Sequence, residues 1–145
     1  MNTNTLDAPV AAPSVWLGPD MARNPATWIY QLSNAELQEI AAAVSHARSI
    51  GLSIPTLAAE GFPLPHLAPK LRELLYEVQF GRGFVLIRGM GALNYGEEDL
   101  SLAYWGLGAY FGKPATQNAK GDVLGHVRDE GRKFGELDAR GYHSN

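Results

Sequence analysis

The stretch GRGFVLIRGM, residues 81–90, decides the fold. Its apolar run, residues 84–88, is too short for a helix and has glycines on both sides, which is typical of a short strand between two turns. We therefore predict a buried strand at 84–88. Because helical patterns precede and follow it, we predict an α+β fold with a helical front half and a rear half of strands and turns.

A helix is predicted directly upstream of this strand. Pro69 suits its first turn, and Gly81 suits its C-terminal cap. The residues that we expect to face the core follow helical spacing: Leu67, Leu71, Leu74, Leu75 and Val78.

A further helix is predicted downstream, over residues 96–112. Acidic residues at 97–99 lie where the positive end of the helix dipole favours them. Gly106 and Gly108 each cost about 1 kcal/mol relative to alanine inside a helix, so we expect another element to pack closely against them. The predicted buried stripe comprises Leu100, Ala103, Tyr104, Leu107 and Phe111.

The first predicted helix begins after Ser33. Ser33 and Glu36 have the spacing of a capping box, and Gly51 ends the helix. Its expected buried face comprises Leu37, Ile40, Ala41, Val44 and Arg48. Before it, prolines throughout residues 1–31 predict an extended arm. We divide the chain into this arm and one domain, residues 32–145.

Composition excludes several classes of function. The 145 residues contain no cysteine, so thiolate metal sites and cysteine nucleophiles are absent. A net charge of -3 without a basic stripe argues against nucleic acid and anionic membranes as partners. The first twenty residues contain no Lys or Arg and no long apolar run, which is unlike a targeting peptide and predicts a cytoplasmic protein.

Two histidines and an aspartate near the end of the sequence are candidate metal ligands. An iron site with two histidines and one carboxylate requires side chains that converge on one point. Residues 123–128 predict a second strand, and there His126 and Asp129, three positions apart, would face opposite ways. His143 lies two residues from the last one. The sequence therefore predicts no catalytic or metal-binding residue in this chain.

Several segments occur in an order that resembles a known family. These are GRGFVLIRGM, then EEDLSLAYWGLGAYFGKPATQNAKGDVLGHVRDEG, then RGYHSN. They resemble the front portion of the taurine dioxygenase-like (TauD/TfdA) family of non-haem Fe(II), 2-oxoglutarate-dependent dioxygenases. The resemblance implies the helices and first strands of a double-stranded β-helix, or jelly roll, with an incomplete barrel.

The resemblance also implies which functional parts this sequence contains. Family members hold iron through a His-x-Asp pair and a distal histidine, and they bind 2-oxoglutarate through a distal arginine. None of these elements matches a position in this sequence. We therefore expect a truncation before the His-x-Asp motif, with Fe(II) and 2-oxoglutarate used by the intact enzyme and neither bound by this chain alone.

The loop after the FGKP segment is the candidate substrate-binding region. In the family this loop contacts the substrate, which implies a substrate-binding role for Gln117, Asn118 and Lys120. Their amides and ammonium would suit a polar or anionic small molecule. The alternative is a polar loop in which Asn118 and Gly121 serve turn geometry. The sequence leaves both interpretations open.

Two hypotheses of function follow. The first is the N-terminal fragment of an oxidoreductase that oxidises a small substrate with O2, releases succinate and CO2 when intact, and is inactive as a fragment. The second is a stand-alone, non-catalytic binding or interaction module. Predicted strands without partners would leave open sheet edges, so we expect self-association.

Overall fold

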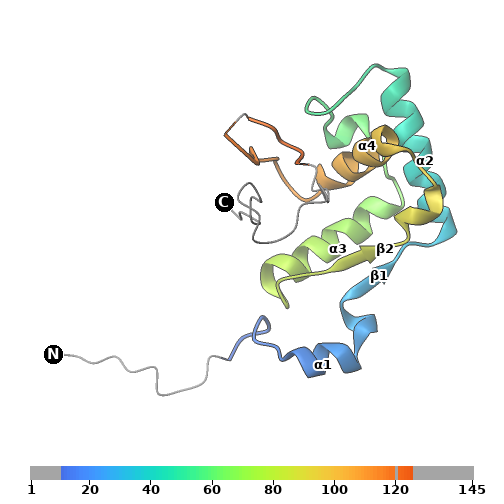
Figure 1. Cartoon of the computed structure of the whole chain (residues 1–145). Helices are drawn as coiled ribbons and strands as arrows, with labels where there is room; N and C mark the ends of the chain where they lie inside the picture. Colours follow the sequence, from blue (N-terminus) through green and yellow to red (C-terminus); the bar gives the residue numbers. More distant parts are fainter. Residues whose placement is uncertain (1–10, 120, 126–145) are drawn as a thin grey trace, which may run out of the picture. The chain divides into compact units, whose positions relative to one another are not determined.

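The computed structural model describes residues 11–119 and 121–125 (Figure 1). Residues group into two compact units, 1–112 and 113–145. The first unit contains these elements in chain order: α1 (Gly18–Arg23), η1 (Pro25–Thr27), β1 (Ile29–Gln31), α2 (Asn34–Ser49), η2 (Ala59–Gly61), α3 (Leu67–Phe80), β2 (Leu86–Arg88), η3 (Met90–Leu93) and α4 (Glu97–Gly108). The described part is thus α+β, as predicted.

Helix α2 begins as its sequence predicts. The Ser33 side chain accepts a hydrogen bond from the backbone N–H of Glu36, and the Glu36 carboxylate accepts one from the backbone N–H of Ser33, which completes a capping box. The buried face comprises Leu37, Ile40, Ala43, Val44 and Ala47. Of the two other residues predicted for this face, Ala41 is partly buried, and the prediction of Arg48 was wrong. Arg48 is exposed because its guanidinium pairs with Asp99 of α4 at 2.7 Å.

Helix α3 receives its N-terminal cap from α2. The Glu39 carboxylate accepts hydrogen bonds from the backbone N–H groups of His66, at 2.7 Å, and Leu67, at 2.9 Å. These are two of the donors that a helix start leaves unpaired. Gly81 is the C-cap, as predicted. Leu67, Leu71 and Leu74 are buried. Leu75 and Val78, predicted for the same stripe, are only partly buried because they lie at its margin.

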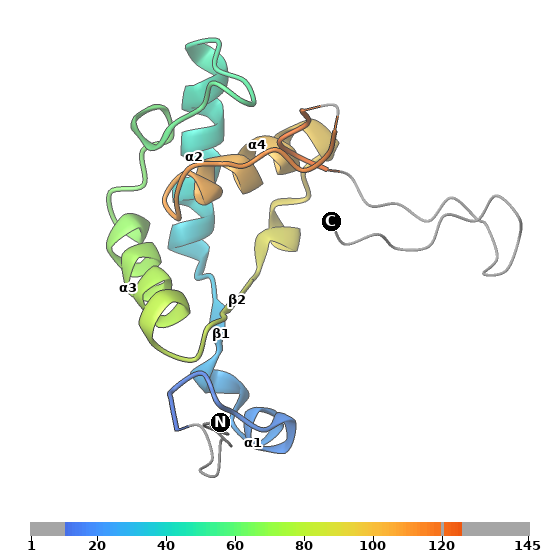
Figure 2. The ribbon, with the colours of Figure 1, turned by 90° about the vertical axis from the view of Figure 1, so that its left-hand side faces the viewer.

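Helix α4 packs against α2 (Figure 2). It ends at Gly108, before the predicted limit of 112, and its buried residues are Leu102, Ala103, Trp105, Gly106 and Leu107. The predicted stripe was wrong at Leu100 and Tyr104, which are 43% and 62% exposed, and at Phe111, which lies beyond the helix and is only partly buried.

The fully buried ring of Phe62 fixes the face that α4 turns inward. A Cβ atom at Gly106 would lie 2.4 Å from this ring. The close packing predicted at Gly106 is therefore confirmed. The same prediction for Gly108 was wrong, because a Cβ atom there would meet nothing within 4 Å. Only the glycine that faces Phe62 is required by packing.

The loop before α3 is held by side chains of the α4 segment. The Trp105 indole donates to the Leu57 carbonyl at 3.0 Å. The Tyr110 hydroxyl donates to the Phe62 carbonyl at 2.8 Å and accepts from the Leu64 N–H at 3.2 Å. Burial raises the pKa of Tyr110 above its ordinary value. Trp105 thus packs in the core and holds the loop through its hydrogen bond.

Strands β1 and β2 form a two-stranded parallel sheet. The register pairs Ile29 with Leu86 and Gln31 with Arg88, and the Leu32 N–H extends the ladder to the Arg88 carbonyl at 2.9 Å. The strand predicted at 84–88 is shorter than expected, and none of its residues is buried. Its burial was mispredicted because no described helix covers its apolar side chains completely.

The segment predicted as an extended arm contains regular structure over its described part, residues 11–31. Pro19 lies in the first turn of α1, and Pro25 begins η1. Proline is compatible with the first turn of a helix because its missing N–H would have no partner there. These prolines therefore start short helices, contrary to the prediction of an extended arm.

In the second unit, the structure describes residues 113–119 and 121–125. Residues 123–125, the described part of the strand predicted at 123–128, form a bend and have no strand pairing. Residues 126–128 lie outside the described part. The glycine at 125 interrupts the apolar pattern on which the strand prediction was based.

Candidate functional site

The candidate metal ligands near the end of the sequence lie outside the described residues. This is true of His126, Asp129 and His143. Within 11–119 and 121–125, no group of three His, Asp or Glu residues could hold a metal ion. His46 and His66 are both exposed, on α2 and before α3. The described residues therefore do not fit the iron site that the family resemblance implies.

Of the three predicted substrate-binding residues, two are described and lie in one exposed loop. Gln117 and Asn118 are adjacent, and Lys120 falls outside the described residues. The Gln117 side chain donates from Nε2 to the Ala115 carbonyl at 2.9 Å. Its backbone N–H donates to the Asp122 carbonyl at 2.6 Å. Gln117 is therefore held by both its backbone and its side chain.

Asn118 is joined to Asp122 by two hydrogen bonds. Its Nδ2 donates to the Asp122 carboxylate at 2.7 Å, and its Oδ1 accepts from the Asp122 backbone N–H at 3.1 Å. Gly121, with φ of +85°, lies between them and donates to the Asn118 carbonyl at 3.1 Å. This geometry supports the turn-forming interpretation of Asn118, while the substrate-binding role of the loop stays a prediction.

Sequence reasoning missed Asp122, although the sequence contained a signal for it. Asn and Asp side chains commonly hydrogen-bond to nearby backbone groups in turns. Asn118 and Asp122 stand four residues apart around Gly121, which adopts the left-handed conformation that glycine favours. This spacing could have identified the pair before the loop was known in three dimensions.

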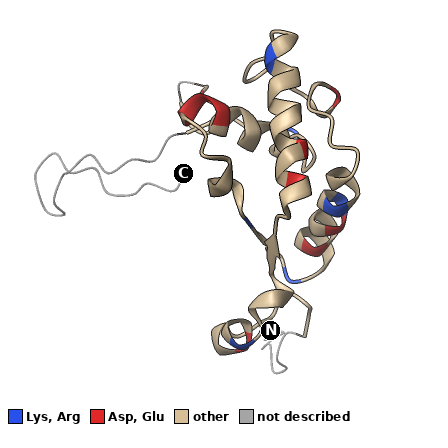
Figure 3. Ribbon diagram, turned by 90° about the vertical axis from the view of Figure 1, so that its right-hand side faces the viewer, with Lys and Arg blue, Asp and Glu red and all other residues tan. Residues whose placement is uncertain are grey.

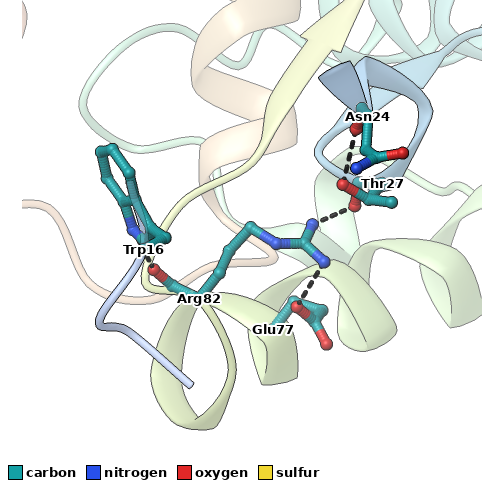
Figure 4. Close-up of polar contacts among 5 residues, drawn as sticks. All are labelled: Trp16, Asn24, Thr27, Glu77 and Arg82. Atoms are coloured by element: carbon teal, nitrogen blue, oxygen red, sulfur yellow. Dashed lines mark hydrogen bonds and ion pairs between the residues drawn. The ribbon is translucent and has the colours of Figure 1, made fainter. Parts of the chain in front are cut away.

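A second polar site lies in the first unit, where the N-terminal segment meets the end of α3 (Figure 4). The Arg82 guanidinium donates to the Thr27 carbonyl and pairs with Glu77 at 3.3 Å. The Trp16 indole donates to the Arg82 carbonyl at 3.1 Å. A cleft of about 390 Å³ lies beside these groups. No sequence motif marked Arg82.

Aromatic contacts beside this cleft show how the α3–β2 turn holds the N-terminal segment. The Phe84 ring lies 5.0 Å from that of Trp16 and 5.7 Å from that of Trp28. Aromatic pairs at such separations stabilise packing beyond the area they bury. Arg82 and Phe84 therefore attach the N-terminal segment to the α3–β2 turn, and the guanidinium is already engaged by protein groups.

Charged residues of both signs are spread over the first unit (Figure 3). Acidic residues gather at the start of α4, where Glu97, Glu98 and Asp99 occupy the first turn. Arg48 neutralises part of this charge through its pairs with Glu98 and Asp99. Within the described ranges, every helix is too short or too polar to cross a lipid bilayer.

Comparisons with known proteins identify relatives of this chain. No family model matches it. A taurine hydroxylase-like protein of Stachybotrys chartarum is 33% identical over 99 residues, which are 68% of this chain and 26% of that protein. The FR-33289 synthase of Streptomyces rubellomurinus is 24% identical over 141 residues, which are 97% of this chain and 41% of that enzyme.

The chain thus spans about a quarter and two fifths of the lengths of these two curated relatives. The similarity covers their N-terminal portions. The resemblance inferred from the residues is therefore confirmed: this chain is similar to the N-terminal portion of taurine dioxygenase-like proteins.

Proposed function

We propose that this chain is the N-terminal portion of a non-haem Fe(II), 2-oxoglutarate-dependent dioxygenase with a jelly-roll fold. The observation that carries the proposal is the match of 97% of this chain to only 41% of the FR-33289 synthase. The open β1–β2 sheet supports it. Parallel strands are normally covered on both faces, whereas no residue of these strands is buried.

The chemistry of the intact enzyme would require residues beyond those that this sequence supplies. No His-x-Asp triplet occurs among the 145 residues, and the described residues offer no set of metal ligands. When bound, Fe(II) and 2-oxoglutarate would supply the oxidising chemistry, with succinate and CO2 as products. We expect these 145 residues alone to be inactive.

The contribution of this portion would be structural support and substrate contact. Helices α2, α3 and α4 would form a base beside the barrel. The 115–122 loop would lie near a small polar substrate, which Gln117, Asn118 and Lys120 would contact through amide and ammonium groups. Self-association through open sheet edges is the expected behaviour of the isolated chain.

The decisive experiment extends the reading frame. The nucleotide sequence after the Asn145 codon is determined, and the longer product is expressed beside the 145-residue chain. We expect a His-x-Asp motif within about a dozen codons, because such iron sites need two histidines and one carboxylate as ligands. With Fe(II) and 2-oxoglutarate, only the longer product should release succinate above a no-protein control.

A variant of the longer product with alanine at the histidine of that motif is the matched control, and it should be inactive. Succinate formation by the 145-residue chain would contradict its proposed inactivity. A longer frame without the motif, together with a sharp and concentration-independent thermal transition of the short chain, would contradict the dioxygenase proposal and favour the non-catalytic module.

A further inference from the structure

The 117–122 loop is closed by a set of mutually dependent hydrogen bonds. The Gln117 N–H reaches the Asp122 carbonyl at 2.6 Å. Asp122 is in turn held to Asn118 by its backbone N–H at 3.1 Å and by its carboxylate at 2.7 Å. The acceptor for Gln117 and the partner for Asn118 thus belong to the same residue. A shift of Asp122 would therefore weaken both interactions.

The orientation of the Asn118 carboxamide follows from chemistry. A carboxylate only accepts hydrogen bonds, so it must face the Nδ2 group, and a backbone N–H only donates, so it must face Oδ1. Both polar atoms of the side chain are therefore engaged within the loop. The bond to the ionised carboxylate is charge-assisted, the stronger class of hydrogen bond.

We propose that Asn118 and Asp122 form a clip that positions Gln117, so that Asn118 is a positioning residue whatever contacts a ligand makes with the loop. The substrate itself rests on the proposed function, but the clip does not. Gln117 Nε2 donates to the Ala115 carbonyl. Among the described contacts, Gln117 Oε1 is left to accept a hydrogen bond from a hydroxyl or ammonium group. The clip therefore determines where the loop presents an acceptor.

Exchanging the two side chains tests the clip. Asn118→Asp alone would set two carboxylates against each other where Nδ2 now lies 2.7 Å from a carboxylate oxygen. Adding Asp122→Asn restores a carboxamide–carboxylate pair in the reverse direction, and the carboxylate introduced at position 118 can still accept the backbone N–H of residue 122. Asp122→Asn alone retains one carbonyl acceptor and should have the smaller effect.

The measurement is amide hydrogen exchange of the Gln117 N–H, followed by NMR in the 145-residue chain. Asn118→Asp should lower its protection about fivefold or more, since a hydrogen bond contributes on the order of 1 kcal/mol. The Asn118→Asp, Asp122→Asn double variant should return protection to within about twofold of the original. Gln117→Ala, the control, should leave residue 117 as protected as before.

Unchanged protection in Asn118→Asp would overturn the clip, because an asparagine that serves only a ligand would not affect the Gln117 amide. Failure of the double variant to restore protection would overturn it as well. Neither result depends on turnover. If the longer product proves inactive while exchange behaves as expected, the dioxygenase proposal fails and the clip stands.

Discussion

The helices and the sheet of the first unit differ in how well their apolar residues are buried. In the described part of the chain, all sixteen buried apolar residues lie in α2, α3 and α4 or in the connections beside them. No residue of β1 or β2 is buried. Both regions belong to one compact unit, yet only the helices and their connections bury apolar side chains.

This difference indicates which region would need further residues to cover its apolar side chains. Helices α2 and α4 pack together, Glu39 caps α3, and Phe62 fills the space at Gly106. A two-stranded parallel sheet is a marginal structure by itself, and parallel strands normally have both faces covered. We infer that the helices provide the stability of the chain, and that the sheet is the place where further strands would add.

The largest expected effect tests this division with two phenylalanines. Phe62 is fully buried among the helices, whereas Phe80, at the end of α3, is 65% exposed. Phe62→Ala should lower the free energy of unfolding by about 3–5 kcal/mol, because it removes buried surface and leaves a cavity. Phe80→Ala should cost less than about 1 kcal/mol, chiefly through its ring contact with Tyr76.

Urea denaturation followed by tryptophan fluorescence measures both phenylalanine variants. The chain contains three tryptophans, including the buried Trp105 of α4, which reports on the helical core. Similar losses in the two variants would show that the core does not depend on Phe62. The inference that the helices provide the stability of the chain would then be wrong.

A second, smaller effect separates the two glycines of α4. Gly106→Ala should destabilise by about 1–3 kcal/mol, since its Cβ would press on the Phe62 ring. Gly108→Ala should stabilise by about 0.5–1 kcal/mol, because its Cβ meets nothing within 4 Å and alanine is the better helix former. Opposite shifts in thermal midpoint are expected, and shifts of the same sign would be inconsistent with this packing.

The sequence predicted those parts of the fold that depend on local interactions. The start of α2 was predictable because Ser33 and Glu36 are neighbours within one turn. The inward face of α4 could not be predicted from local interactions. The run from Leu100 to Leu107 is apolar almost all round, so periodicity could not select a face, and the distant Phe62 ring selected it instead.

The sheet and the sites show the same limit. β1 could not be predicted because its partner β2 lies 57 residues away, and no local pattern encodes a parallel pairing at that separation. Arg82 was missed because its role depends on Thr27 and Trp16. Gln117 and Asn118 were selected because the matching loop contacts the substrate in the family that the sequence resembles, whereas the role of Asp122 depends on how the loop closes.

The smallest expected effect concerns the link between β1 and α2. The Tyr30 hydroxyl donates to the Glu36 carboxylate. Burial, followed by this hydrogen bond, raises the pKa of Tyr30 to about 12. Burial alone would raise the pKa of Glu36, but the hydrogen bonds from Tyr30 and Ser33 lower it overall. The link therefore exists only between two pH limits.

At the upper limit, a folded pKa above the unfolded value near 10 means that the stabilisation is complete below about pH 10 and is lost as pH approaches 12. At the lower limit, a depressed folded pKa means that stabilisation is present above the unfolded value of Glu36 and is lost as pH falls below it.

Tyr30→Phe should remove the loss of stability at high pH and weaken the loss at low pH. Tyr104→Phe, at a 62% exposed tyrosine, should change neither. Thermal midpoints across pH, with tyrosinate absorbance, measure both limits. An unchanged profile in Tyr30→Phe would mean that this bond does not couple the sheet to the helices.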